Sequence, residues 1–112
     1  MACNVILLSA FKRSSKRLVR KYPSLKAELL RLAMDLAENP LLGVDLGGGY
    51  RKICLAIESK NVGRRGGARV ITAAIVEMEN TVALLYVYDK SERSSISIAH
   101  LRKLVADERL DG

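Results

Sequence analysis

Three basic side chains, spread between positions 52 and 90 of the sequence, have the clearest chemistry. Lys52, Arg69 and Lys90 each lie at or near an end of a strand-like apolar run, and consecutive strands are usually neighbours in a sheet. A guanidinium group binds phosphate oxygens in pairs and stabilises charge that grows in a transition state, whereas an amine or a phenol transfers protons. RNA supplies its own nucleophile, the 2′-hydroxyl group. Together these groups suit metal-independent cleavage of an RNA phosphodiester.

Each of these cations also has an ordinary interpretation, because soluble proteins place Lys and Arg at strand ends and in loops. Arg69 has the strongest claim, since it follows Gly-Gly-Ala and opens an apolar strand. The connection before it carries mobile loop charges that attract phosphates without specificity: Lys60, Arg64 and Arg65. Tyr86 and Tyr88 share one face of the last strand, where a phenol stacks on a base, transfers a proton or fills the core.

Overall charge points to a polyanionic partner. The 112 residues include 19 Lys and Arg against 12 Asp and Glu, a net charge of +7, which favours nucleic acid first and an acidic protein second. A chain of this length is expected to form one domain, residues 1–112. No apolar run approaches the roughly 20 residues of a membrane span, and the first residues lack the features of a signal peptide. We therefore expect a cytoplasmic protein without membrane contact.

The sequence contains no pattern for a metal or cofactor. Cys3 and Cys54 lack CxxC spacing and are expected to be reduced and structural, and the single histidine, His100, is expected at the surface or in a helix cap. The glycines at 47–49 precede a strand and are not followed by GxxxxGK[ST], so they indicate a turn rather than a phosphate-binding loop.

The elements that position these residues follow from the apolar pattern. A strand at 4–8 precedes a basic amphipathic helix at 10–21 with Ser9 as its cap. Ser24 is the expected N-cap of a second helix, antiparallel to the first, whose leucine stripe ends before Asn39 and Pro40. Residues 41–49 are expected to be a loop.

Three consecutive strands are expected next. From Arg51 the chain alternates, with Ile53 and its partners on one face and Lys52 on the other. The runs at 69–78 and 81–88 form a central hairpin, and a short helix follows Ser97. This order predicts an α+β fold in which two N-terminal helices pack on one face of an antiparallel sheet and the other face stays open.

Five segments, in this order, carry a resemblance: KYPSLKAEL, ENPLLG, LGGGYRKICLAI, GGARVIT and YVYDKSERS. The ordered set resembles the RelE/ParE superfamily of toxins from bacterial type II toxin–antitoxin modules, and above all its RelE and HigB type members. The resemblance implies a microbial-ribonuclease-like fold with a twisted sheet. It implies an mRNA endonuclease of the ribosomal A site, in which the 2′-hydroxyl attacks the adjacent phosphate and leaves a 2′,3′-cyclic phosphate.

The resemblance also implies roles for residues. Lys52 matches a lysine associated with proton abstraction, and Arg69 matches the arginine that stabilises the phosphate. Cys54 replaces a second family lysine, and Ser97 stands where RelE has a catalytic tyrosine, so Tyr88 is the expected substitute. The candidate catalytic residues are Lys52, Arg69, Lys90 and Tyr88. The candidate RNA-binding residues are Arg51, Lys60, Arg64, Arg65 and Arg93.

The implied partners are mRNA, the ribosome and a cognate antitoxin, through which operator DNA is bound indirectly. Two alternatives remain open on the sequence. One is a non-enzymatic inhibitor of DNA gyrase, as in the ParE branch of the superfamily, since a shared fold does not decide function. The other is a binding module that serves only as half of a repressor complex.

Overall fold

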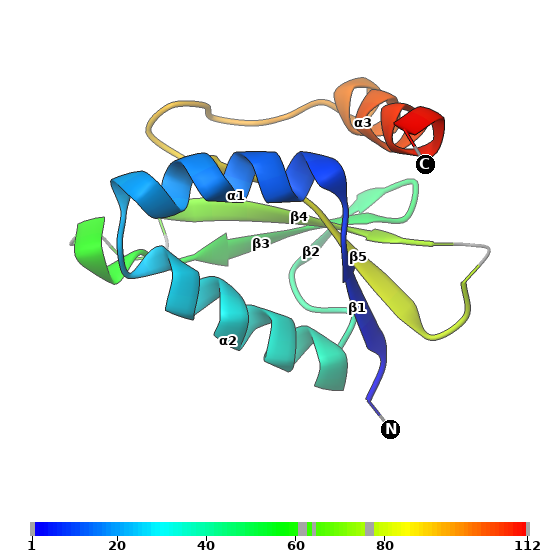
Figure 1. Cartoon of the computed structure of the whole chain (residues 1–112), viewed down its shortest axis with the longest axis horizontal. Coiled ribbons are helices and arrows are strands. Elements are labelled where there is room, and N and C mark those ends of the chain that lie inside the picture. The colour runs from blue at the N-terminus through cyan, green and yellow to red at the C-terminus, as the bar shows by residue number, and fades with distance from the viewer. Residues whose placement is uncertain (1, 61–62, 64, 76–77, 112) are drawn as a thin grey trace.

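The computed structural model describes residues 2–60, 63, 65–75 and 78–111. Within these residues one five-stranded sheet, in the order β1-β5-β4-β3-β2, is covered by three α-helices (Figure 1). The elements are β1 (Asn4–Leu7), α1 (Ser9–Lys21), α2 (Leu25–Glu38), β2 (Val44–Gly47), β3 (Tyr50–Leu55), the 3-10 helix η1 (Glu58–Lys60), β4 (Ala68–Ala74), β5 (Thr81–Asp89) and α3 (Ile98–Asp111).

Helices α1 and α2 pack on one face of the sheet, as the sequence predicts. The leucine stripe of α2 is buried together with Phe11 and Leu18 of α1, against Val70 and Val87 of the central strands. The two helices run in opposite directions and splay apart beyond the turn that joins them (Figure 1). None of the described helices is long and apolar enough to cross a membrane.

The sheet is mixed rather than antiparallel throughout. Strands β3, β4 and β5 form the expected antiparallel group with β4 at its centre, but β1 pairs with β5 in parallel. Parallel neighbours need a long connection between them, and two helices and three strands separate β1 from β5 in the chain. The first strand therefore adds an edge whose direction the apolar pattern alone does not specify.

Strand β2 lies inside the stretch expected to be a loop. It pairs with β3 through Val44 opposite Lys52 and Asp45 opposite Arg51, and its four residues are too few for a clear alternation. The turn between the two strands is the glycine turn that the sequence predicts. Gly48 and Gly49 there have φ angles of 65° and 87°, a backbone region that other residues rarely adopt.

The second face of the sheet is not open, which corrects the expectation of helices on one face only. Helix α3 covers part of it, burying Leu101 in a cluster with Ile71, Ala73 and Leu85. Strands β4 and β5 are apolar on both faces, and such continuous runs are typical of strands covered from both sides. On this face Cys54 is exposed, and Lys52 and Tyr86 are partly exposed.

Helix α3 is also anchored to the start of α1. Ser9 is the first residue of α1 rather than its cap, and both its backbone N–H and its hydroxyl donate to Glu108, at 2.8 and 3.2 Å. A carboxylate at a helix N-terminus accepts hydrogen bonds from free N–H groups and interacts favourably with the positive end of the helix dipole. Ser24 does occupy the N-cap of α2, although its hydroxyl bonds Glu28 and Ser59 instead of a helix N–H.

Candidate active site

Three candidate residues meet on the sheet face that lies away from α1 and α2. Arg69 of β4 is directly opposite Cys54 of β3 on one side and Tyr88 of β5 on the other. Lys52 faces Ile71, two positions along, and is therefore the diagonal neighbour of Arg69. Directly opposite Cβ atoms lie about 5 Å apart in a sheet and diagonal neighbours about 7 to 8 Å. The register thus brings together a guanidinium, a phenol and an ammonium group.

Arg69 is held in place by its own strand and the turn before it. Arg69 is only 7% exposed, and its guanidinium donates to the carbonyl oxygens of Ala68 and Arg65, at 3.2 and 3.0 Å. A group fixed in this way loses little entropy when it receives a phosphate, which is the basis of electrostatic preorganisation.

Tyr88 is the second buried polar group of this row and is 4% exposed. Its burial raises the pKa of the phenol above the ordinary value of 10.0, against the opposing effect of the Arg69 charge; Cys54 adds to the rise and Arg93 opposes it. The phenol therefore carries its proton at neutral pH, so it is suited to donate a hydrogen bond or a proton rather than to accept one.

Lys90 and Arg93 lie in the segment that leaves β5. The Lys90 ammonium group donates to the carbonyl of Ser94 at 3.2 Å, so it braces this segment. The Arg93 guanidinium carbon lies 5.9 Å from the centre of the Tyr86 ring, and one of its nitrogens is 3.4 Å from Nδ1 of His100. Arg93 thus borders the row, while the described contacts of Lys90 are structural.

Arg51, which is also predicted to bind RNA, does not belong to this row. Arg51 alternates with Lys52 and so lies on the opposite side of β3, where its guanidinium donates to the carbonyls of Leu42 and Gly43 at 3.2 and 2.9 Å. Arg65 is exposed in the turn before β4. Arg64 lies outside the described residues.

Lys60 is not the mobile loop charge that the sequence indicates. It ends η1, its side chain is only 16% exposed, and its ammonium group lies 2.6 Å from Asp89, 2.9 Å from the Gly66 carbonyl and 3.0 Å from the Ser91 hydroxyl. The ammonium points into the protein, where a carboxylate and two other acceptors satisfy it. We therefore assign Lys60 to the framework of the site.

Asp89 is the centre of this framework and escaped the sequence analysis. It is fully buried and accepts hydrogen bonds from Tyr22 at 2.6 Å, Lys60 at 2.6 Å and the Ser91 N–H at 2.9 Å. Burial alone would raise its pKa, but the hydrogen bonds from Lys60, Tyr22 and Ser91 hold the pKa well below its usual range. An Asp that ends an apolar strand and bonds the second N–H after it forms an Asx turn, which is the signal that could have revealed it.

The positions where the sequence departs from the RelE pattern have distinct surroundings. Both cysteines are free thiols, as the sequence predicts: Cys54 is exposed beside Arg69, whereas Cys3 is buried and donates to the Leu36 carbonyl. Ser97 precedes α3, and its hydroxyl accepts the N–H of His100 at 3.1 Å. This serine is a helix cap. Among the described residues no three His, Cys, Asp or Glu side chains are placed to hold a metal ion.

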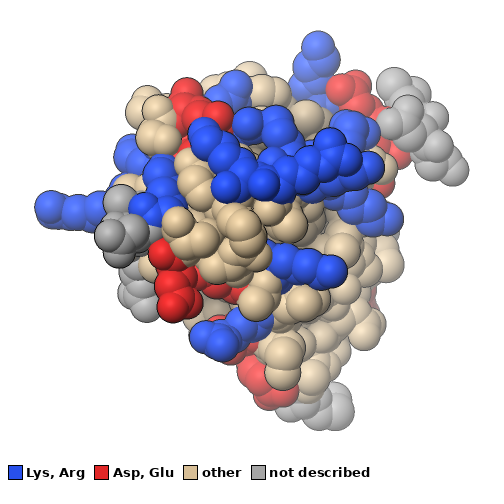
Figure 2. Space-filling view, turned by 60° about the vertical axis from the view of Figure 1, so that its left-hand side comes forward, with Lys and Arg blue, Asp and Glu red and all other residues tan. Residues whose placement is uncertain are grey.

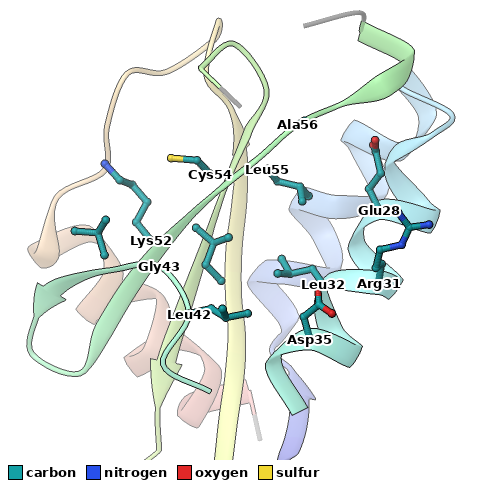
Figure 3. A pocket seen from close by; sticks show the side chains of 12 residues that line it. Glu28, Arg31, Leu32, Asp35, Leu42, Gly43, Lys52, Cys54, Leu55 and Ala56 are labelled. Carbon is teal, nitrogen blue, oxygen red and sulfur yellow. The ribbon is translucent and has the colours of Figure 1, made fainter. Parts of the chain in front are cut away.

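A cavity of about 540 Å³ lies between α2 and β3, and its wall includes Lys52 and Cys54 but neither Arg69 nor Tyr88. Figure 3 shows Leu32 of α2 and Leu55 of β3 pointing toward each other across it, whereas Lys52 and Cys54 point away from α2. A second cavity of about 340 Å³ does adjoin the row, because Tyr88 forms part of its wall. It lies between α1, β5 and α3.

Positive charge is concentrated on α1. The helix contains no acidic residue and exposes a set of six cations: Lys12, Arg13, Lys16, Arg17, Arg20 and Lys21. Lys and Arg side chains form a band across the molecule at the height of this helix (Figure 2). This confirms the predicted basic amphipathic helix, and such a band attracts polyanions over distances of about a Debye length.

Comparison with known families identifies the chain. Residues 9–107 match the family described as the RelE toxin of the RelE / RelB toxin–antitoxin system, so the chain belongs to the RelE toxin family. It is therefore a toxin of a toxin–antitoxin system, and a RelB-type antitoxin is its cognate partner. The comparison with curated proteins gave no match.

Proposed function

We propose that this toxin is a ribosome-dependent endoribonuclease that cleaves translated mRNA through attack by the 2′-hydroxyl group. The observation that carries the proposal is the row of Arg69 and Tyr88 on adjacent strands, with Lys52 on the diagonal. The family of the chain supports the class of activity, since RelE family toxins are generally endoribonucleases.

The three side chains match the requirements of the reaction. When O2′ attacks phosphorus, the bond to the 5′-oxygen breaks, one proton leaves the 2′-hydroxyl and another reaches the departing oxygen. The amine of Lys52 is the acceptor that we assign to the first proton, and the protonated phenol of Tyr88 delivers the second. Arg69 binds the non-bridging oxygens as their charge grows. The products are a 2′,3′-cyclic phosphate and a free 5′-hydroxyl.

The antitoxin would inhibit by covering this surface. Tyr88 of the row shares a cavity with Arg13 and Arg17 of the basic band on α1, so an acidic or helical segment of a partner that binds there excludes RNA both sterically and electrostatically. Operator DNA would then be bound by the complex through the antitoxin.

The test is primer extension on mRNA translated in the presence of the full chain. We expect cuts at codon-linked positions that disappear with Arg69→Ala and persist with Arg31→Ala, which removes an exposed arginine of α2, a helix that packs on the other face of the sheet. Equal loss with both variants would reject the site. Intact mRNA together with inhibited DNA supercoiling would instead favour the gyrase alternative, and absence of growth arrest would favour the repressor module.

A further inference from the structure

The 340 Å³ cavity beside the row has the composition of a nucleotide site. Its volume falls within the range of about 300 to 1,000 Å³ that is usual for ligand pockets. Its wall carries two arginines, three aromatic rings and no carboxylate: Ala10, Arg13, Ser14, Arg17, Tyr86, Val87, Tyr88, His100 and Leu104. We call this cavity the α1–α3 groove.

Aromatic rings cluster in the groove. The ring centre of Tyr86 lies 6.3 Å from that of Tyr88 and 6.3 Å from that of His100, with tilts of 35° and 46°. Tyr86 is only half-buried, so part of its ring faces the groove. Each nucleic acid base has a π-face, and stacking on such a ring stabilises binding with little regard to sequence.

The two arginines of the groove differ in whether their guanidinium groups already have an ion-pair partner. Both guanidinium nitrogens of Arg17 that face Glu92 donate to its carboxylate, so this charge is already balanced. Arg13 is exposed, and its guanidinium makes no hydrogen bond or ion pair with the part of the chain that the structure describes. It is therefore the cation of the groove that can bind a phosphate without first giving up a partner.

The position of the groove relates it to the cleavage site. Tyr88 lines the groove and is also directly opposite Arg69, so the groove begins one strand away from the proposed phosphate position. We propose that the α1–α3 groove binds a nucleotide that flanks the scissile phosphate, with its base stacked on Tyr86 and its phosphate held by Arg13. This inference rests on the proposed ribonuclease function and adds a subsite to it.

The test pairs a protein substitution with a substrate substitution. Ribosomes programmed with mRNA that carries an abasic nucleotide on the 5′ or the 3′ side of the cleavage site are treated with the full chain. At one of these two positions, wild type should cut the abasic mRNA about five- to 100-fold more slowly, as loss of base stacking predicts. Tyr86→Ala should cut both mRNAs at the same rate, and Tyr86→Phe, which keeps the ring, should discriminate as wild type does.

A second variant tests the phosphate contact without touching the core. The measurement is the half-saturating toxin concentration at several salt concentrations, plotted as logarithm against logarithm. The slope of this plot should fall by about one for Arg13→Ala and should keep the wild-type value for Arg31→Ala. If Tyr86→Ala slows on abasic mRNA as much as wild type does, or if wild type cuts both mRNAs at the same rate, the subsite is overturned. In either case the cleavage itself upholds the proposed function. Absence of cleavage by wild type overturns both. Loss of antitoxin binding in Tyr86→Ala, without discrimination by wild type, would assign the groove to a protein partner instead.

Discussion

Replacing Asp89 with Asn should strongly destabilise the fold although it changes no side-chain volume. Asp89 joins three separate parts of the chain, because it accepts hydrogen bonds from Tyr22 after α1, from Lys60 of η1 and from Ser91 beyond β5. The substitution leaves the Lys60 ammonium, itself largely buried, next to a neutral amide.

The expected loss follows from the burial of both charges. Removing one partner of a buried ion pair costs about 3 to 5 kcal/mol, because the remaining charge stays desolvated. Asn retains the shape and one acceptor oxygen, so we expect the lower end of this range, about 3 kcal/mol, which is roughly a 100-fold change in the folding equilibrium. A buried pair need not stabilise relative to two apolar residues, so Lys60→Met combined with Asp89→Asn should cost less than the sum of the two single changes.

Urea unfolding at pH 7 measures this free energy, with Asp35→Asn on the exposed side of α2 as the matched control. Folding lowers the pKa of Asp89, so its stabilisation is complete above the ordinary value of 3.8 and is lost as pH falls below it. The difference in free energy of unfolding between wild type and Asp89→Asn should therefore become smaller as pH drops toward 3. An Asp89→Asn protein as stable at pH 7 as the Asp35→Asn control would refute the reasoning.

Three further predictions address packing, catalysis and helix anchoring. A Cβ atom on Gly67 would lie 2.1 Å from the Leu55 carbonyl oxygen, so Gly67→Ala should lower the free energy of unfolding in urea by about 1 to 3 kcal/mol, and unchanged unfolding would show that the strands can separate there. Tyr88→Phe should reduce the single-turnover cleavage rate at least about 100-fold without lowering the melting temperature, and a wild-type rate would remove the phenol from the mechanism. Glu108→Gln should lower stability by about 1 kcal/mol through its contacts with Ser9, whereas Asp107→Asn, at an exposed position, should have no effect.

Much of the fold could be predicted because the apolar residues repeat with clear periods. The leucine stripe of α2 and the alternation around Ile53 gave the helix and the strand with boundaries within a few residues of those found. The expectations about the fold that were wrong concern features that depend on contacts between distant segments. The parallel pairing of β1, the cover that α3 gives to the second face and the short β2 are decided by tertiary packing rather than by local pattern.

The candidate site was predictable where strand register alone positions a residue. Arg69 and Tyr88 meet because they occupy facing positions of the central hairpin, whereas the same reasoning could not show that Lys60 turns inward to Asp89 or that the Arg51 guanidinium bonds backbone carbonyls of the preceding loop. Side chains as long as lysine and arginine reach partners several residues away, so their sequence position says little about where their charge lies. The α1–α3 groove likewise exists only because α3 folds back beside α1.

The most direct test of the proposed reaction removes a single oxygen atom from the substrate. Ribosomes programmed with mRNA are incubated with the purified full chain, using either all-ribose mRNA or mRNA with one 2′-deoxynucleotide immediately 5′ of the mapped cleavage position. Our account predicts cleavage of the ribose mRNA to a 2′,3′-cyclic phosphate and an intact strand when the 2′-hydroxyl is absent. Continued cutting at the deoxy position would contradict it.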